Sequence, residues 1–304
     1  MEDDTLLKFV FRAGPVRGEI VRLSESWRQI GGRHRLPGAV QRLLGESTAA
    51  AALLASTIKF NGALLLQIHG DGPVSLLVVE CQPNLALRAT AKLREAVVIA
   101  ESAGLPELVN ATGRGRCAIT LDPRAQLPGQ QAYQGIVPLE GDSIAQALQS
   151  YLLRSEQLES RLWLAADANC AAGLLLQRLP HAQVTQAQAC GEDDDLWERA
   201  GALASTLTPE ELLATRPSEL LHRLFWQEPN DRFAPMQPHF ACTCTRERIA
   251  GMLRSLGREE VDSIVAEQGQ CSVTCDFCST THVFDAVDAA TLFSPAAQAA
   301  PGLH

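Results

Sequence analysis

The chain has 304 residues, of which 46% are hydrophobic and 20% charged, and its net charge at pH 7 is −9. This composition is that of a folded globular protein and excludes an intrinsically disordered chain. The negative charge disfavours broad binding to nucleic-acid phosphates, and no apolar run approaches the roughly 20 residues that span a bilayer. We therefore expect neither a nucleic-acid partner nor a membrane partner.

The first residues and the cysteine count predict the cellular compartment. The chain begins Met1-Glu2-Asp3-Asp4, which is acidic where a secretory signal would be basic. Nine cysteines are present, and an odd number argues against a complete disulfide framework in an oxidising compartment. We expect a cytoplasmic protein. None of its three lysines lies in a G-x-x-x-x-G-K-[ST] loop, which excludes a P-loop nucleotide site.

Residues 1–180 predict one core domain. The Ala/Leu-rich run 40–58 has high helix propensity and little polarity, which predicts a buried helix. A second helix begins near Asp142 or Ser143, where apolar residues start to recur at helical spacing. Because strand-like runs precede and follow the helices, we favour an α+β fold with a mixed sheet over a doubly wound sheet. The predicted strands are 6–11, 63–69, 74–81, 85–91, 116–121, 132–139, 161–166 and 173–179.

Residues 181–235 predict a charged helical linker. Between Glu192 and Asp231, ten acidic residues stand against three arginines. The segment is nevertheless patterned for helices, with a capping box at Thr208-Pro209-Glu210-Glu211. Short helices with like charges crowded on one side depend on tertiary packing. We expect a metastable linker that is stable only while docked, although an ordinary helical linker remains an alternative.

Residues 236–290 predict a small zinc module, followed by a disordered tail at 291–304. Five of the nine cysteines fall within 37 residues here. Cys242-Thr243-Cys244 precedes two helical stretches, 246–256 and 259–267, and Cys275-Asp276-Phe277-Cys278 precedes an alternating stretch. A module of about 50 residues with few large apolar side chains is marginal without a staple. Four thiolates around one tetrahedral Zn²⁺ supply such a staple.

The residues alone leave the choice of four ligands open. Five cysteines offer five sets of four, and His239 and His282 are possible nitrogen ligands. Cys271 lies four residues before Cys275, outside the C-x-x-C loop, which favours a bystander role. The other four cysteines are interpreted as small hydrophobic residues or inert thiols: Cys81, Cys117, Cys170 and Cys190.

A zinc–thiolate site is either a static zinc ribbon or a switch. Metal-bound sulfur is held as thiolate, which is the form that oxidants attack. Each cysteine pair is close enough in sequence to form a disulfide within itself, and the disulfide would no longer hold the ion. Structural zinc is worth on the order of 10–16 kcal/mol of apparent binding free energy, so its loss would unfold the module. The C-x-C pair favours the switch, because its strained disulfide is relatively oxidising.

The chain resembles the redox-regulated 33 kDa heat-shock chaperone family of bacteria over nearly its whole length. The C-x-C and C-x-x-C pairs, separated by 30 residues, are the most specific part of this resemblance. The motifs that carry the rest are Val16-Arg17-Gly18-Glu19, Lys59-Phe60-Asn61-Gly62, Gly70-Asp71-Gly72-Pro73, Tyr133-Gln134-Gly135, Leu139-Glu140-Gly141-Asp142, Ser155-Glu156-Gln157, Thr245-Arg246-Glu247-Arg248 and Glu260-Val261-Asp262-Ser263-Ile264.

The resemblance implies an ATP-independent holdase rather than an enzyme, acting in the cytoplasm during oxidative stress. It implies a mixed-sheet core domain, a helical linker and a zinc-binding C-terminal domain. One zinc ion per reduced chain is implied on Cys242, Cys244, Cys275 and Cys278. The resemblance further implies that peroxide with heat, or hypochlorous acid, forms a disulfide within each pair and releases zinc. It implies that the linker then loses structure, that unfolding client proteins bind, and that a homodimer forms.

The client-binding surface is not carried over residue by residue. The apolar faces of the linker helices are the candidates: Leu196, Trp197, Leu203, Leu207, Leu220, Leu224 and Phe225. Two departures from the family pattern are Cys271, an extra cysteine, and His282, where an aromatic residue is expected. A thiol–disulfide oxidoreductase using Cys275 and Cys278 is one alternative function, although it lacks the expected βαβ context. A zinc-ribbon nucleic-acid binder is another, disfavoured by the net charge.

Overall fold

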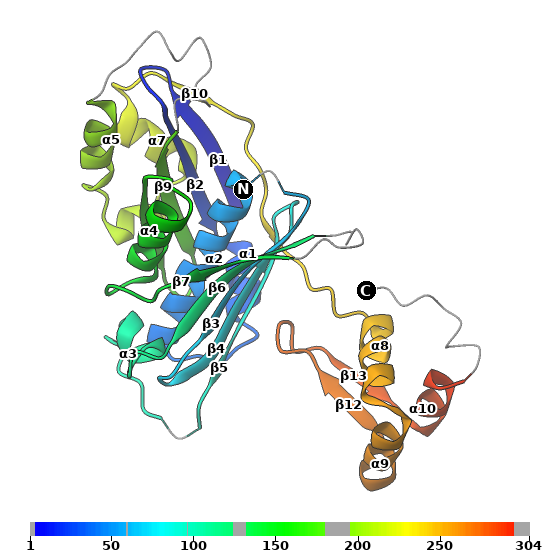
Figure 1. The fold of residues 1–304 in the computed structure, drawn as a ribbon. Helices are drawn as coiled ribbons and strands as arrows, with labels where there is room; N and C mark the ends of the chain where they lie inside the picture. The colour runs from blue at the N-terminus through cyan, green and yellow to red at the C-terminus, as the bar shows by residue number, and fades with distance from the viewer. Residues whose placement is uncertain (1–3, 59, 96, 124–131, 180–194, 295–304) are drawn as a thin grey trace. The chain divides into compact units, whose positions relative to one another are not determined.

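The computed structural model describes residues 4–58, 60–95, 97–123, 132–179 and 195–294. The chain divides into two compact units, Met1–Ala241 and Cys242–His304 (Figure 1). Predictions for 180–194, including Cys190, and for 295–304 lie outside the described residues. Among the described residues, every helix is too short or too polar to cross a bilayer.

The first unit is built on two sheets, which confirms the predicted α+β class with mixed sheets. The five-stranded sheet has the order β10-β1-β2-β9-β8 and the six-stranded sheet the order β11-β5-β4-β3-β6-β7. All neighbours are antiparallel except β11 and β5. The strands are β1 (Asp4–Phe11), β2 (Val16–Leu23), β3 (Gly62–His69), β4 (Val74–Cys81), β5 (Ala86–Leu93), β6 (Arg116–Pro123), β7 (Tyr133–Val137), β8 (Ser160–Ala166), β9 (Ala171–Arg178), β10 (Asn230–Arg232) and β11 (His239–Phe240).

Helix α2 (Gly38–Thr57) contacts strands of both sheets and forms the centre of the main core. Its alanines at positions 49–52 are fully buried, as the run of small apolar residues predicts. Small side chains let backbones approach closely, and at Gly45 a Cβ would lie 2.5 Å from that of Ala166. The other helices of this part are α1 (Glu25–Gly31), α3 (Leu105–Val109) and α4 (Ile144–Ser155), and Ser143 is the N-cap of α4.

The linker helices cover the face of the five-stranded sheet that carries Phe9 and Phe11. They are α5 (Leu196–Ala204), α6 (Pro209–Ala214) and α7 (Pro217–Phe225), and Thr208 caps α6 as its motif predicts. The Phe225 ring packs on Phe9 and Phe11 at centroid distances of 5.8 and 5.2 Å. Of the client-binding candidates, four are buried in this second core and three are partly buried against it: Leu196, Trp197, Leu220 and Phe225, then Leu203, Leu207 and Leu224.

The second unit is small. It contains α8 (Arg246–Leu256), α9 (Arg258–Gln268), β12 (Cys271–Thr274), β13 (Thr281–Phe284) and α10 (Ala286–Leu292). Helix α8 has the bounds predicted for it, because Thr245 caps its start and Gly257 ends it at φ +103°. Seven described residues form its buried core: Ala250, Leu253, Val261, Cys271, Phe284, Ala289 and Leu292. So small a core makes the unit a candidate for stabilisation by a metal.

The bounds of this unit differ in detail from the sequence-based domain limits. Residues 236–241, assigned to the zinc module by sequence, contribute a bridge at Met236 and strand β11 to the sheets of the first unit. Helix α10 extends to Leu292, two residues into the predicted tail. The metastability expected of the linker helices concerns the oxidised protein, so it stays a prediction.

Candidate metal centre

Two short segments bring four cysteine sulfurs together in the second unit. Cys242 and Cys244 precede α8, and Cys275 and Cys278 lie in the turn between β12 and β13. The turn is closed by hydrogen bonds from the Cys275 N–H to the Thr280 carbonyl (3.0 Å) and from the Ser279 N–H to the Cys275 carbonyl (2.9 Å). All four Sγ atoms lie within 4.8 Å of one another.

The spacing of the sulfurs suits one tetrahedral metal ion. A zinc ion with Zn–S bonds of about 2.3 Å places its ligand sulfurs about 3.8 Å apart. The Sγ atoms of Cys242 and Cys275 are separated by 3.7 Å, and those of Cys244 and Cys278 by 3.1 Å. Four soft thiolates without a carboxylate are the donor set typical of structural zinc. The residues present therefore fit a zinc ion, with small movements of the sulfurs.

The electrostatics of the four thiols also favours a cation. Burial raises the pKa of Cys244, and hydrogen bonding to Cys278 raises it further. Burial acts in the same direction on Cys278, but hydrogen bonds from Thr280 and Cys244 outweigh it and lower the Cys278 pKa to about 6. The cluster thus accommodates one thiolate more readily than four, because neighbouring thiolates repel one another. A divalent cation would offset this repulsion, so binding of the cation should release protons from the remaining thiols.

The remaining candidate ligands lie outside this cluster. Cys271 is only 3% exposed and packs in the core of the second unit. His282, on β13, pairs with Val273, and its buried Nε2 has no hydrogen-bond partner among the described residues. His239 is exposed on β11. Burial raises the pKa of Cys81 and Cys117 to about 12, which suits inert thiols in the first unit.

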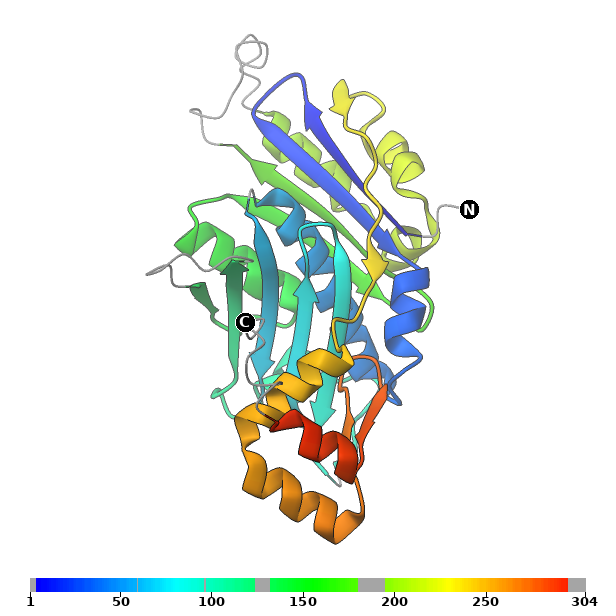
Figure 2. The same cartoon turned by 90° about the vertical axis from the view of Figure 1, so that its right-hand side faces the viewer.

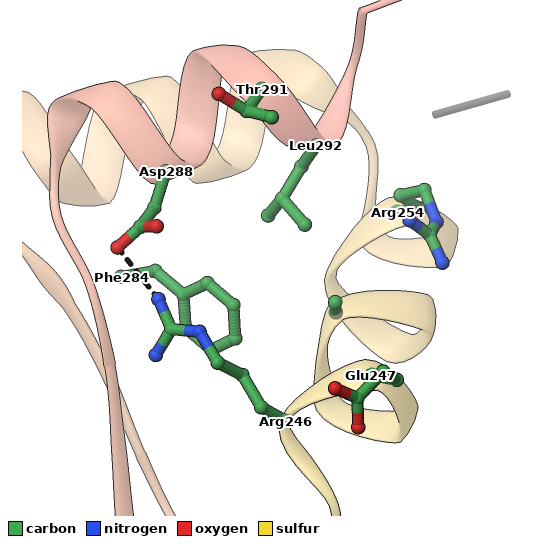
Figure 3. A pocket seen from close by; sticks show the side chains of 8 residues that line it. Arg246, Glu247, Arg254, Phe284, Asp288, Thr291 and Leu292 are labelled. Carbon is green, nitrogen blue, oxygen red and sulfur yellow. Dashed lines mark hydrogen bonds and ion pairs between the residues drawn. The ribbon is translucent and has the colours of Figure 1, made fainter. Parts of the chain in front are cut away.

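Arg246 links the chain segments that leave the two cysteine pairs, whereas the sequence analysis placed it in a family motif without assigning it a role. It begins α8, two residues after Cys244, and its guanidinium lies 4.3 Å from the centre of the Phe284 ring. It donates to the Val283 carbonyl at 2.7 Å. It also donates to Asp288 Oδ2 at 2.7 Å (Figure 3). A pocket of about 230 Å³ lies beside it, with Arg254 on its rim (Figure 3). The signal in the sequence is an arginine at the first position of a helix, two residues after a C-x-C pair.

The comparisons with known proteins now decide the family. The family described as Hsp33 protein matches residues 4–285. The chain belongs to the Hsp33 family. A 33 kDa chaperonin of Methylobacillus flagellatus is 45% identical over 96% of this chain and 94% of its own length. One of Vibrio cholerae is 38% identical over 100% of both chains.

A solved structure shares the fold of this Hsp33 chain. The 33 kDa chaperonin of Thermotoga maritima has a TM-score of 0.77 and 22% sequence identity, covering 95% of this chain and 97% of its own. The family match and the two relatives confirm the resemblance seen in the motifs, and with it a chaperone family. The four cysteines implied as ligands are the four that the structure brings together. The C-x-x-C pair lies in a β-hairpin turn rather than in a βαβ unit, which gives no support to an oxidoreductase.

Proposed function

We propose that this Hsp33 chain is a redox-regulated, ATP-independent holdase of the cytoplasm that binds unfolding proteins during oxidative stress. The observation that carries the proposal is the convergence of four thiols within 4.8 Å in a unit with a small core of its own. In the reduced state, Cys242, Cys244, Cys275 and Cys278 would hold one zinc ion. The ion supplies a positive charge that keeps the sulfurs as thiolates and cross-links two segments of the unit.

Oxidation would dismantle this centre. Two thiolates lose two electrons to form one S–S bond, and one hydrogen peroxide takes up those electrons with two protons to give two waters. The two disulfides, Cys242–Cys244 and Cys275–Cys278, therefore consume two peroxide molecules. One residue separates the first pair and two separate the second, so each ring closes locally. Disulfide sulfur is a poor zinc ligand, so the ion leaves.

Loss of zinc from the second unit would also destabilise the linker helices, which are connected to it by the chain. Without the metal, the second unit loses the stabilisation that its few buried side chains do not replace. The acidic linker helices α5, α6 and α7 then undock, uncovering their own apolar faces and the sheet face with Phe9 and Phe11. Exposed apolar surface would bind unfolding clients and join two activated chains as a homodimer.

Oxidation of the zinc-loaded protein tests this proposal. Zinc release, far-UV circular dichroism and suppression of aggregation of an unfolding client are measured before and after peroxide treatment. The proposal expects zinc release, loss of helical signal and a gain of client protection in the same samples. Unchanged helicity, or equal client protection before and after oxidation, would contradict it.

A further inference from the structure

One extended segment completes both sheets of the first unit. Residues 229–241, here called the strap, begin three residues after the end of α7 and lead to Cys242 (Figures 1 and 2). Within the strap, β10 is the end strand of the five-stranded sheet, beside β1. Strand β11 is the end strand of the six-stranded sheet, beside β5. The strap thus covers an edge of each sheet.

The strap is held by main-chain hydrogen bonds as well as by side chains, of which Met236 and Phe240 pack against the main core and Asp231 pairs with Arg12. Leu6 and Met236 exchange two N–H···O bonds of 2.9 Å each. The Phe233 N–H donates to the Lys8 carbonyl (2.9 Å), and the His239 N–H donates to the Leu85 carbonyl (3.1 Å). Such bonds recognise an extended backbone whatever its side chains. The edges of β1 and β5 are therefore built to bind extended polypeptide.

The strap does not use all the main-chain hydrogen bonds that these edges offer. Along β1 its pairing is interrupted, with a three-residue ladder and a separate bridge at Leu6, and along the eight-residue strand β5 it pairs in ladder register with only two residues. Pro229, Pro235 and Pro238 lack the N–H that a regular strand would offer. A continuous segment without prolines could pair with more residues of β5 than the strap does and could pair with β1 without interruption. The strap is thus replaceable by another extended chain.

The C-terminal end of the strap adjoins the candidate metal centre. The Ala241 N–H donates to the Leu87 carbonyl at 3.0 Å, and the next residue, Cys242, is a proposed zinc ligand. The N-terminal end follows α7, the last linker helix. Undocking of the linker and collapse of the metal centre would therefore leave the strap without an anchor at either end.

We propose that the strap-covered edges of β1 and β5 are binding sites for the extended main chain of unfolding clients. The strap occupies them in the reduced protein and vacates them on oxidation, so the inference rests on the proposed function. Main-chain pairing fits a partner that varies in sequence but shares an unfolded backbone. An open strand edge also promotes aggregation, which gives a physical reason to keep it covered at rest.

Amide hydrogen exchange of the full-length chain tests the inference. The chain is compared in the reduced zinc-bound state, after oxidation, and after oxidation with urea-unfolded malate dehydrogenase. The Leu6 amide, which faces the strap, should exchange at least about tenfold faster after oxidation and regain protection with the client. If it never becomes faster, or stays fast while the client is kept soluble, the inference is wrong and the holdase proposal stands. If the oxidised chain keeps no client soluble, both fail.

A synthetic strap peptide, residues 229–241, separates main-chain pairing from apolar contact. It should bind the oxidised full chain, be displaced by the unfolded client and fail to bind the reduced chain. Methylation of the Met236 nitrogen removes a donor to Leu6 and should weaken binding at least about tenfold. Methylation at Arg232, whose N–H points away because its neighbour Phe233 donates to β1, is the matched control. Equal binding of the two methylated peptides would overturn the inference.

Discussion

The Sγ atoms of Cys244 and Cys278 lie 3.1 Å apart, although the two residues are 34 positions apart in the chain. The segments that meet here include the turn before α8 and the turn between β12 and β13. A metal ion at this point therefore joins both halves of the second unit.

Substitution of one of the four clustered cysteines should abolish tight zinc binding, whereas substitution of Cys271, which lies outside the cluster, should not. In Cys278→Ser a hydroxyl replaces a thiolate ligand, and zinc affinity should fall by more than about 100-fold, beyond the loss typical of an outer-shell change. In Cys271→Ala the four clustered sulfurs remain, and a small cavity should cost about 1 kcal/mol of stability. Zinc content by atomic spectroscopy, with a chelator competition, distinguishes the two. Loss of zinc from Cys271→Ala would contradict the ligand set.

Arg246→Ala should weaken zinc binding without touching a ligand. The substitution removes two hydrogen bonds and the contact with Phe284, and because Arg246 is partly exposed the loss is about 1–2 kcal/mol. Folding of the unit and zinc binding are linked, so zinc affinity should fall about 5- to 30-fold. Arg254→Ala, on the same helix and pocket, is the control and should change affinity little. Equal effects of the two variants would remove the role assigned to Arg246.

The local signals in the sequence explain which parts of the fold were predictable. Helix α8 begins after a capping threonine and ends at a glycine with positive φ, and both residues act on their own segment. The cysteine pairs were equally readable, because ligand spacing is a property of short motifs. The identity of the four ligands needed either the family resemblance or the structure, since five cysteines fit the spacing arguments.

Strand β2 and the strap were not predicted, because their partners are distant in the chain. In β2, Arg17, Gly18 and Glu19 break the apolar pattern of a strand. The structure supplies the reasons: the Phe9 ring lies where a Gly18 side chain would be, and Glu19 is buried beside Lys8 at 3.6 Å. The strap reads as a loop because of its prolines. Its pairing with β1 and β5 is a long-range property that no local pattern encodes.

Arg161→Ala should loosen the docking of linker helix α5. The Arg161 guanidinium donates twice to the Glu198 carboxylate, at 2.9 and 2.8 Å, and lies 4.7 Å from the centre of the Trp197 ring. Glu198 is largely exposed, so the loss should be about 1 kcal/mol. We expect faster amide exchange in α5 and client protection at lower peroxide doses. Arg223→Ala, which breaks an exposed pair within α7, should leave both unchanged.

Glu46→Gln should stabilise the first unit more at high pH than at low pH. Glu46 is partly buried on α2, and burial raises its pKa from 4.5 to about 7, opposed by Arg42. Below 4.5 the carboxyl is protonated in both the folded and unfolded states; above about 7 folding must bury its charge. The free energy of unfolding of the wild-type protein therefore falls as pH rises from 4.5 to about 7, because the unfolded state releases the Glu46 proton first. The gain on substitution should grow by about 2 to 3 kcal/mol between about pH 5 and about pH 8.

Urea unfolding of the reduced, zinc-loaded proteins at the two pH values measures this difference. The substitution lies in the first unit, so zinc content should be the same in both proteins. A stability gain that is equal at the two pH values would show that folding does not change the pKa of Glu46, which would contradict the raised pKa assigned to its burial.

The most direct test of the redox mechanism is native mass spectrometry of the intact chain during peroxide treatment, with zinc occupancy and disulfide connectivity read from the same sample. The account predicts one zinc ion and four free sulfurs at the start. At each later time, every chain that carries both the Cys242–Cys244 and the Cys275–Cys278 disulfide should be free of zinc, and every chain that retains zinc should still hold its four sulfurs as thiolates. Chains that hold both disulfides and still retain zinc would contradict it.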